Sequence, residues 1–209
     1  MRLWLMRHGA TEGNELHRYV GRRTDEPLSE QGRAQCASFG TFPQVEKVYV
    51  SPLLRARQTA ELCYPHAEIV TVSGLEEFDF GAFEGRSARD MEHDEAYRAW
   101  VDGWCTGRCP GGEDRAEFVH RTAAALEALL RGAIERGEQR VVVVAHGGTI
   151  MAALHAFADG SSLEDDYFGW SVGCCEGYEC DVTWPTGHLR LTPAVSTFAS
   201  RQRFRSMRQ

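Results

Sequence analysis

Two short apolar segments of the chain each run directly into a histidine that is followed by glycine. Residues 2–6 precede Arg7-His8-Gly9, and Arg140–Ala145, which contains four consecutive valines, precedes His146-Gly147-Gly148. Short apolar runs of this kind are typical of strands buried on both faces of a parallel sheet. Ligands bind such sheets beyond the carboxyl ends of the strands. The pattern therefore predicts an α/β fold in which both histidines lie at the ligand-binding edge.

The rest of the chain alternates between extended and helical patterns. Further strands are expected at Val45–Val50 and Glu68–Val72, and the last strands within residues 167–192, with turns at Glu176-Gly177 and Pro185-Thr186-Gly187. Ser29 is a plausible N-cap for a helix that runs to about Phe39, and Ser51-Pro52 starts a helix over Leu53–Cys63 with proline at its first position. An amphipathic period predicts a long helix over Glu113–Glu135. Two further helices are expected over Asp94–Trp104 and Thr149–Ala158.

This alternation predicts a three-layer α/β/α sandwich with a mostly parallel central sheet, to which the final strands add antiparallel edges. No repeat or long linker interrupts the pattern, so we expect a single domain over residues 1–209. The last residues, from about 200 to 209, are expected to form a mobile tail.

Charge and composition limit the partners of the chain. The formal net charge is -7, and an acidic surface argues against nucleic acid, whose backbone requires a basic face. No apolar run approaches the ~20 residues of a membrane helix, and the apolar stretch at the N-terminus is too short for a signal peptide. The seven cysteines, an odd number without a secretory signal, indicate reduced thiols. We therefore expect a cytoplasmic protein without a membrane or nucleic acid partner.

A third predicted strand ends at Ser51 and leads into a helix that carries Arg55. Three strand ends would therefore deliver His8, His146 and Arg55 to one place. Guanidinium groups match the oxygens of a phosphoryl group in pairs, and a neutral imidazole can attack phosphorus to form a phosphohistidine. This combination favours phosphoryl transfer.

Six blocks of the sequence then resemble, in order, the signature blocks of the histidine phosphatase, or phosphoglycerate mutase-like, superfamily. They are Arg7-His8-Gly9-Ala10-Thr11-Glu12-Gly13-Asn14, Pro27–Gly32, Ser51–Ala60, Leu75–Gly85, Pro110–Glu113 and Ala145–Gly148. The resemblance spans roughly residues 1–155, with a weaker similarity in the final strands. Any one block is weak evidence, but six in the family's order are strong.

The resemblance implies roles for individual residues. His8 would be the nucleophile, and Glu77 would protonate the leaving oxygen and then accept a proton from water. Thr11 is either a hydroxyl of the pocket or the cap of a local turn. No metal and no cofactor are expected, since arginine and histidine take the place of a metal. The groups that would hold the phosphoryl oxygens are Arg7, Arg55, His146, Asn14 and the Gly147 N–H.

One position beside the expected acid departs from the family pattern. Many relatives carry Arg or Asn where this chain has Glu76. A second carboxylate there either raises the pKa of Glu77, if the two are close, or faces solvent. Glu76, Asp79 and Glu84 are further candidates for the acid, although the resemblance favours Glu77.

Several other residues have both a structural and a functional interpretation. Arg57 is expected to have a structural role, in which it at most supports the residues of the pocket without contacting a ligand. Trp100 and Trp104 fit either a pocket wall or a packing stripe on a helix, and packing is favoured. The arginines of the tail are expected in solvent, with a flap over an anionic substrate as the alternative: Arg201, Arg203, Arg205 and Arg208.

Three functions are compatible with these features: a phosphatase, a cofactor-dependent phosphoglycerate mutase, and a non-catalytic phosphate-binding protein. The compact stretch from Arg86 to Arg108, together with Phe80 and Val20-Gly21, differs from the mutases. The Leu75–Gly85 and Pro110–Glu113 blocks resemble the α-ribazole phosphatase-like and broad-specificity branch, and a binding protein has no need of an acid. We therefore expect a metal-independent phosphatase acting on a small phosphorylated metabolite. A homodimer through an edge strand stays open.

Overall fold

The computed structural model describes residues 1–39, 43–158 and 167–194 of the 209-residue chain. Its strands are β1 (Arg2–Arg7), β2 (Lys47–Val50), β3 (Glu68–Thr71), β4 (Arg140–Ala145), β5 (Gly177–Thr183) and β6 (Arg190–Pro193). They form one six-stranded sheet in the order β3-β2-β4-β1-β5-β6. Strands β1 to β4 are parallel, whereas β5 and β6 add antiparallel pairings at one edge.

The centre of the sheet is the pair β1 and β4, which are in register from Arg2 with Arg140 to Arg7 with Ala145. The four valines of β4 are at most 1% exposed. Because side chains alternate along a strand, Val141 and Val143 pack on one face of the sheet and Val142 and Val144 on the other. Both faces of these strands are therefore covered, as the apolar runs predict.

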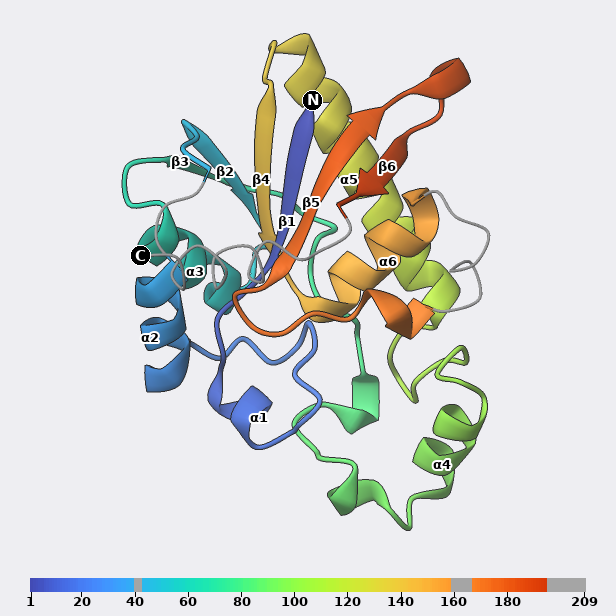
Figure 1. The fold of residues 1–209 in the computed structure, drawn as a ribbon. Coiled ribbons are helices and arrows are strands. Elements are labelled where there is room, and N and C mark those ends of the chain that lie inside the picture. Colours follow the sequence, from blue (N-terminus) through green and yellow to red (C-terminus); the bar gives the residue numbers. More distant parts are fainter. Residues whose placement is uncertain (40–42, 159–166, 195–209) are drawn as a thin grey trace.

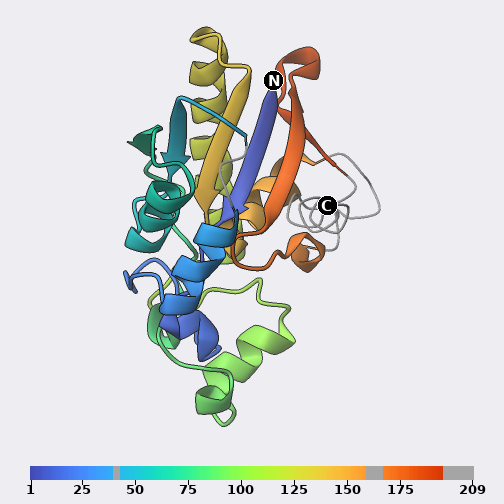
Figure 2. The ribbon, with the colours of Figure 1, turned by 60° about the vertical axis from the view of Figure 1, so that its left-hand side comes forward.

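The helices are α1 (Glu12–Glu15), α2 (Glu30–Phe39), α3 (Leu54–Cys63), α4 (Glu95–Asp102), α5 (Arg115–Glu135) and α6 (Gly147–Phe157). Helices α2 and α3 cover one face of the sheet, and α5 and α6 cover the other (Figures 1 and 2). The predicted three-layer α/β/α sandwich is thereby confirmed. No helix among the described residues is long and apolar enough to cross a membrane.

A third apolar cluster lies beyond the carboxyl ends of the parallel strands, around α4 and the loops that flank it. At its centre are Phe78, Phe83, Trp100 and Phe118, all at most 8% exposed. Figure 1 shows this region beneath the strand ends, next to α1. The cluster forms a separate layer over the edge of the sheet where β1, β2 and β4 end.

Helix starts differ in part from the sequence predictions. Ser29 does cap α2, since its hydroxyl accepts from the Gly32 N–H at 3.0 Å. Helix α3 begins at Leu54 rather than at Pro52, because Leu53 is extended and the Leu54 N–H donates to the Asp25 carboxylate at 2.6 Å. Helix α6 begins at Gly147, directly after the strand.

Two other segments also differ from the sequence predictions. Residues 167–176 contain no strand: Tyr167–Trp170 is a 3-10 turn, and β5 starts only at Gly177. The Glu176 carboxylate accepts from the Gly173 N–H at 3.1 Å and holds this connection as a turn. The short helix α1 was not predicted, because its capping residues lie within a glycine-bearing stretch. The arginine-rich tail lies outside the described residues.

Candidate active site

The carboxyl ends of β1, β2 and β4 bring His8, Arg55 and His146 together, as the strand pattern predicts. The rings of His8 and His146 lie 5.1 Å apart between centroids and meet edge to face. The Arg55 Nε lies 3.3 Å from the His8 Nε2. All three side chains are at most 3% exposed. Two histidines from opposite ends of the chain are thereby in contact.

The hydrogen bonds of His8 define which ring nitrogen carries the proton. Its Nδ1 lies 2.6 Å from the Gly9 carbonyl oxygen, which can only accept, so Nδ1 carries the hydrogen. Its Nε2 receives the Arg55 Nε–H and therefore holds a lone pair. Burial, followed by the charges of Arg55 and Arg7, holds the pKa of His8 well below its usual value. The imidazole is therefore neutral at physiological pH, with the free lone pair of the ring on Nε2.

Glycine is required at position 9 for this arrangement. A Cβ on Gly9 would lie 2.8 Å from the Gly32 carbonyl oxygen of α2. The Gly9 N–H donates to the Thr59 hydroxyl at 2.9 Å. The backbone that orients His8 is therefore held between α2 and α3.

Arg55 is a completely buried cation whose two Nη groups donate to backbone carbonyls. Its Nη1 donates to Thr24 at 2.7 Å and its Nη2 to Gly21 at 3.0 Å. Burial lowers its pKa, and the carboxylates of Glu77 and Asp25 oppose this effect. A buried guanidinium that is neutralised only in part is suited to bind an anion.

His146 has one nitrogen in use and one without a partner. Its Nε2 lies 2.7 Å from the Ser51 hydroxyl, and that hydroxyl accepts from the Leu53 N–H at 3.4 Å. The Ser51 hydroxyl hydrogen can therefore point to Nε2, which leaves the proton of the ring on Nδ1. Among the described residues nothing pairs with this buried Nδ1. A buried polar atom without a partner next to His8 is suited to meet a ligand oxygen.

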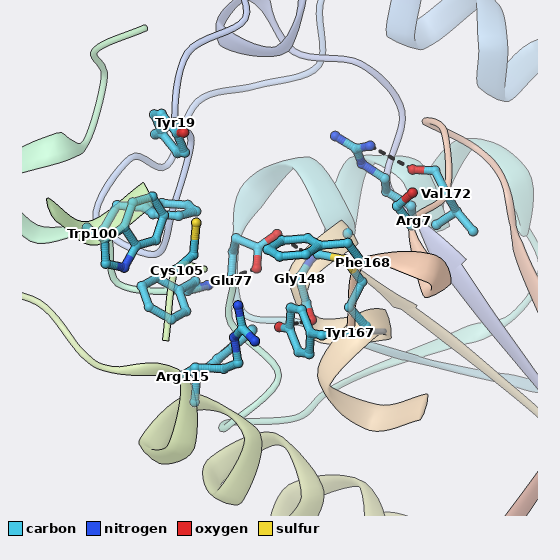
Figure 3. A pocket seen from close by; sticks show the side chains of 16 residues that line it. Arg7, Tyr19, Glu77, Trp100, Cys105, Arg115, Gly148, Tyr167, Phe168 and Val172 are labelled. Carbon is cyan, nitrogen blue, oxygen red and sulfur yellow. Dashed lines mark hydrogen bonds between the residues drawn. The ribbon is translucent and has the colours of Figure 1, made fainter. Parts of the chain in front are cut away.

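Arg7 has a similar unused donor. Its Nη1 donates to the Val172 carbonyl at 2.8 Å, as Figure 3 shows, whereas its buried Nε has no partner among the described residues. Gly147 faces this group, since a Cβ there would lie 3.5 Å from the Arg7 Nε. The Gly147 N–H belongs to the first turn of α6 and extends the set of donors at this strand end.

Glu77 is a buried carboxyl at the wall of the same site. Its Oε2 accepts from the Gly148 N–H at 2.9 Å and its Oε1 from the Phe78 N–H at 2.8 Å. Burial raises its pKa, although these two N–H groups and the charges of Arg55 and Arg7 act in the opposite direction. A carboxyl with a raised pKa beside a neutral histidine can act as a proton donor.

The other candidate acids are engaged elsewhere. The Glu76 carboxylate accepts from the Gly74 N–H at 2.9 Å and pairs with Arg121 at 3.5 Å. Asp79 pairs with Arg23 at 2.8 Å. Glu84 accepts from the Thr24 hydroxyl at 2.6 Å. Glu77 alone among these four carboxylates lines the cavity to which Arg7 and Gly147 also belong.

Arg121 of α5 holds the segment that presents Glu77, and nothing in the sequence pattern indicated it. Its Nη1 donates to the carbonyls of Gly74 and Glu76 at 3.0 and 3.1 Å, and its Nη2 to that of Glu77 at 3.3 Å. The same guanidinium binds the Glu113 carboxylate at 2.6 Å. The extra carboxylate at position 76 thus helps to bind this arginine rather than facing Glu77 or solvent.

Thr11 and Asn14 form the cap of α1. The Thr11 hydroxyl accepts from the Asn14 N–H, and the Asn14 Oδ1 accepts from the Thr11 N–H at 3.2 Å. Of the two interpretations of Thr11, the structure therefore favours the cap. Arg57 forms an exposed pair with Glu61 at 3.0 Å and does not brace the site.

The cavity beside Glu77 has a volume of about 300 Å³ (Figure 3). Arg7, Glu77, Gly147 and Gly148 line part of it. Most of the remaining lining residues are aromatic: Trp100 comes from α4, Phe118 from α5 and the others from connecting segments. These segments meet only in the folded molecule, which is why the sequence did not indicate the cavity. The aromatic residues are Tyr19, Phe78, Phe80, Trp100, Phe118, Tyr167 and Phe168.

The two tryptophans of the α4 region have different surroundings. Trp100 is 8% exposed and lines the cavity, so it packs and forms a wall at once. Trp104 is 76% exposed, and the expectation that it packs against the core is wrong. It follows α4 with a φ of 57°, and the change in backbone direction turns its side chain outward.

The described residues contain no cluster of three or more His, Cys, Asp or Glu side chains that could hold a metal ion. All seven cysteines are free thiols, and Cys36 and Cys175 approach to 3.6 Å between sulfurs. The charged and titratable groups gathered at the site are arginines, histidines and Glu77.

Comparisons with known proteins give matches over most of the chain. The model of the histidine phosphatase superfamily (branch 1) matches residues 3–181. The adenosylcobalamin/alpha-ribazole phosphatase of Salmonella typhimurium is 30% identical over 191 residues, which are 85% of this chain and 93% of that protein.

Solved structures show the same fold. The alpha-ribazole phosphatase of Shigella flexneri is 24% identical, with a TM-score of 0.75 over 94% of this chain and 96% of that one. A phosphoglycerate mutase of Thermus thermophilus is 30% identical, with a TM-score of 0.68 over 94% and 100% of the two chains.

Proposed function

This chain belongs to branch 1 of the histidine phosphatase superfamily, and from this we infer that it hydrolyses small phosphate monoesters through a phosphoryl group carried on His8. One observation supports this mechanism most directly. The neutral His8 ring directs its unprotonated Nε2 toward buried cations, where a phosphoryl group would be attracted. The fold alone would not distinguish a nucleophile from a binding residue.

The phosphoryl oxygens have a sufficient set of donors. We propose that the Arg7 Nε, the His146 Nδ1 and the Gly147 N–H bind them, since the first two are buried without a partner among the described residues. Arg55 supplies the buried charge next to Nε2. Asn14 can add its side-chain amide N–H₂, which the cap of α1 does not use. Fixed charges of this kind stabilise the phosphoryl group as it is transferred.

The reaction then has two steps. In the first, the His8 Nε2 forms a bond to phosphorus, the bond from phosphorus to the ester oxygen breaks, and Glu77 protonates the leaving oxygen. In the second, water attacks the phosphohistidine while the Glu77 carboxylate takes its proton, which restores His8 and releases phosphate. No metal is required, because the arginines carry the positive charge.

The wall of the cavity supports a leaving group with a ring. Aromatic side chains surround the space beyond Glu77, where the leaving oxygen would depart. Rings stack well against such walls. The relative from Salmonella typhimurium is named for alpha-ribazole, and we propose a ring-bearing phosphate ester here as well. The free thiols support a cytoplasmic location.

The mutase remains the second candidate, because a structure of similar fold is named phosphoglycerate mutase. Such an enzyme would return the phosphoryl group of His8 to a small, hydrophilic glycerate. Most residues that line the cavity are aromatic or apolar and suit the ring of an ester better than a glycerate, so phosphatase activity is favoured.

The first test is to incubate the purified protein with p-nitrophenyl phosphate in EDTA, beside a 3-phosphoglycerate mutase assay with and without 2,3-bisphosphoglycerate. We expect phosphate release that persists in EDTA and no mutase activity. A phosphohistidine trapped by alkaline quench in the wild type and absent in His8→Ala would support the intermediate. Mutase activity that requires the bisphosphate would make the second candidate correct.

A further inference from the structure

The cavity contains a cation for which the proposed reaction has no use. Arg115, the first residue of α5, points from the helix into the cavity toward Tyr167 (Figure 3). Its guanidinium carbon lies 4.5 Å from the centroid of the Tyr167 ring and 5.2 Å from that of Phe168. Arginine on an aromatic face is held in orientation while its N–H edges stay available.

Arg115 has no carboxylate partner among the described residues. Neighbouring arginines do have one: Arg108 pairs with Asp114 at 3.0 Å, and Arg121 pairs with Glu113 at 2.6 Å. The only side-chain hydrogen bond of Arg115 within the described part of the chain runs from Nη2 to the Trp104 carbonyl. A guanidinium carries five N–H donors, so most of those of Arg115 have no partner within the described part of the chain.

Tyr167 contacts both Arg115 and the backbone next to the proposed acid. Its hydroxyl lies 3.4 Å from the Gly148 carbonyl oxygen, and the Gly148 N–H binds Glu77. The guanidinium of Arg115 lies over the face of the same ring, with its carbon 4.5 Å from the ring centroid. Tyr167 therefore contacts both Arg115 and the backbone that holds Glu77. A leaving group with one ring between its ester oxygen and a distal substituent is of a size that fits between these two groups.

The charges favour a distal group with one negative charge. Arg7 and Arg55 face the phosphoryl group, which leaves Arg115 as a single cation in a largely apolar wall. A carboxylate matches both the single charge and the planar N–H edge of guanidinium. A second phosphate group would bring nearly twice that charge to one arginine.

We propose that Arg115 is a specificity-determining residue that binds a carboxylate on the far side of an aromatic leaving group. The substrate class is then an aryl phosphate, or a similar ring-bearing phosphate ester, that carries a carboxylate opposite the ester. This inference rests on the proposed function of the site, because it takes the phosphoryl position from His8.

The test compares phenyl phosphate with 4-carboxyphenyl phosphate, which differ only in the carboxylate. We expect the wild type to prefer the carboxylated ester in kcat/KM. The ratio of the two values should fall roughly 10-fold or more in Arg115→Gln, as expected for loss of charge-assisted hydrogen bonds, while phenyl phosphate turnover changes little. Arg115→Lys should keep part of the preference, and Arg131→Gln, on the exposed side of the same helix, should keep all of it.

An equal loss for both esters in Arg115→Gln would overturn the inference and indicate that Arg115 only supports Tyr167. An unchanged ratio, or no preference in the wild type, would overturn it as well. The same comparison is made by calorimetry as dissociation constants of the two esters with His8→Ala, so that it does not depend on turnover. A carboxylate preference in binding without hydrolysis by the wild type would refute the proposed function and leave the role of Arg115 supported.

Discussion

Replacing Gly148 with alanine should remove the general acid without touching Glu77 itself. A Cβ on Gly148 would lie 2.2 Å from the Glu77 Oε1 and 3.0 Å from its Cδ, whereas ordinary contacts begin near 3.4 Å. The carboxyl must therefore move by about 1 Å, and it loses its hydrogen bond to the Gly148 N–H. A misplacement of about 1 Å can cost on the order of 10²-fold in rate, and general acid catalysis contributes about 10²–10⁴-fold.

The loss should depend on the leaving group. Phenolate is a strong base and leaves slowly without a proton, so kcat/KM for phenyl phosphate should fall about 10²-fold in Gly148→Ala. p-Nitrophenolate leaves readily without a proton, so the loss for p-nitrophenyl phosphate should stay below about 10-fold. Initial rates at saturating and limiting concentrations of both esters measure this difference.

Gly107→Ala is the matched control. A Cβ there would meet no heavy atom within 4 Å, and the residue lies outside the proposed phosphoryl site. Its kcat/KM for both esters should remain near that of the wild type. If Gly148→Ala kept the wild-type rate on phenyl phosphate, or lost both esters equally, Glu77 would not be the acid in the geometry described.

Three further predictions concern the other groups of the site. His8→Ala should lose at least about 10³-fold in kcat and form no phosphohistidine, with an unchanged far-UV circular dichroism spectrum; residual wild-type turnover would contradict the nucleophile. Burial raises the pKa of Glu77 and lowers that of His8, so kcat/KM should be high at neutral or mildly acidic pH. It should fall as rising pH deprotonates Glu77. A pH profile of Glu77→Gln that keeps this alkaline decline would refute the assignment of Glu77 as the acid. Arg121→Gln should lower kcat more than it changes KM. It should also destabilise the fold by about 2 kcal/mol, because it leaves Glu113 and three carbonyls without their donor. Denaturant unfolding measures the stability effect, with Arg131→Gln, which breaks only an exposed pair, as the control.

Much of the fold could be predicted from patterns that extend over only a few consecutive residues. The valines of β4 and the apolar run of β1 predict buried strands, because alternating side chains need cover on both faces. The strand ends then place His8 and His146 at one edge by topology alone. Ser29 likewise predicted the start of α2, because an N-cap bonds to backbone groups only a few residues away.

Several local signals were insufficient. Leu53–Leu54 follow a proline that could have opened the helix, yet Asp25, 29 residues earlier, binds the Leu54 N–H and sets the start. Thr11 could equally cap a turn or face the pocket until its pairing with Asn14 was visible. For Leu54 the deciding partner comes from a distant segment, whereas for Thr11 it lies three residues away in a local cap whose formation the sequence alone did not settle.

The sequence by itself thus determined the three layers, the buried strands at the centre of the sheet and the residues at their ends. Only the tertiary structure showed which of the four carboxylates lines the cavity, because Arg121 and Arg23 bind Glu76 and Asp79 from distant elements. The aromatic cavity and the position of Arg115 also depend on the tertiary structure, since the segments around residues 19, 80, 100 and 167 meet only in space. The physical reason is range: periodicity and capping act between neighbours in the chain, whereas burial and ion pairing select partners by proximity in the folded molecule.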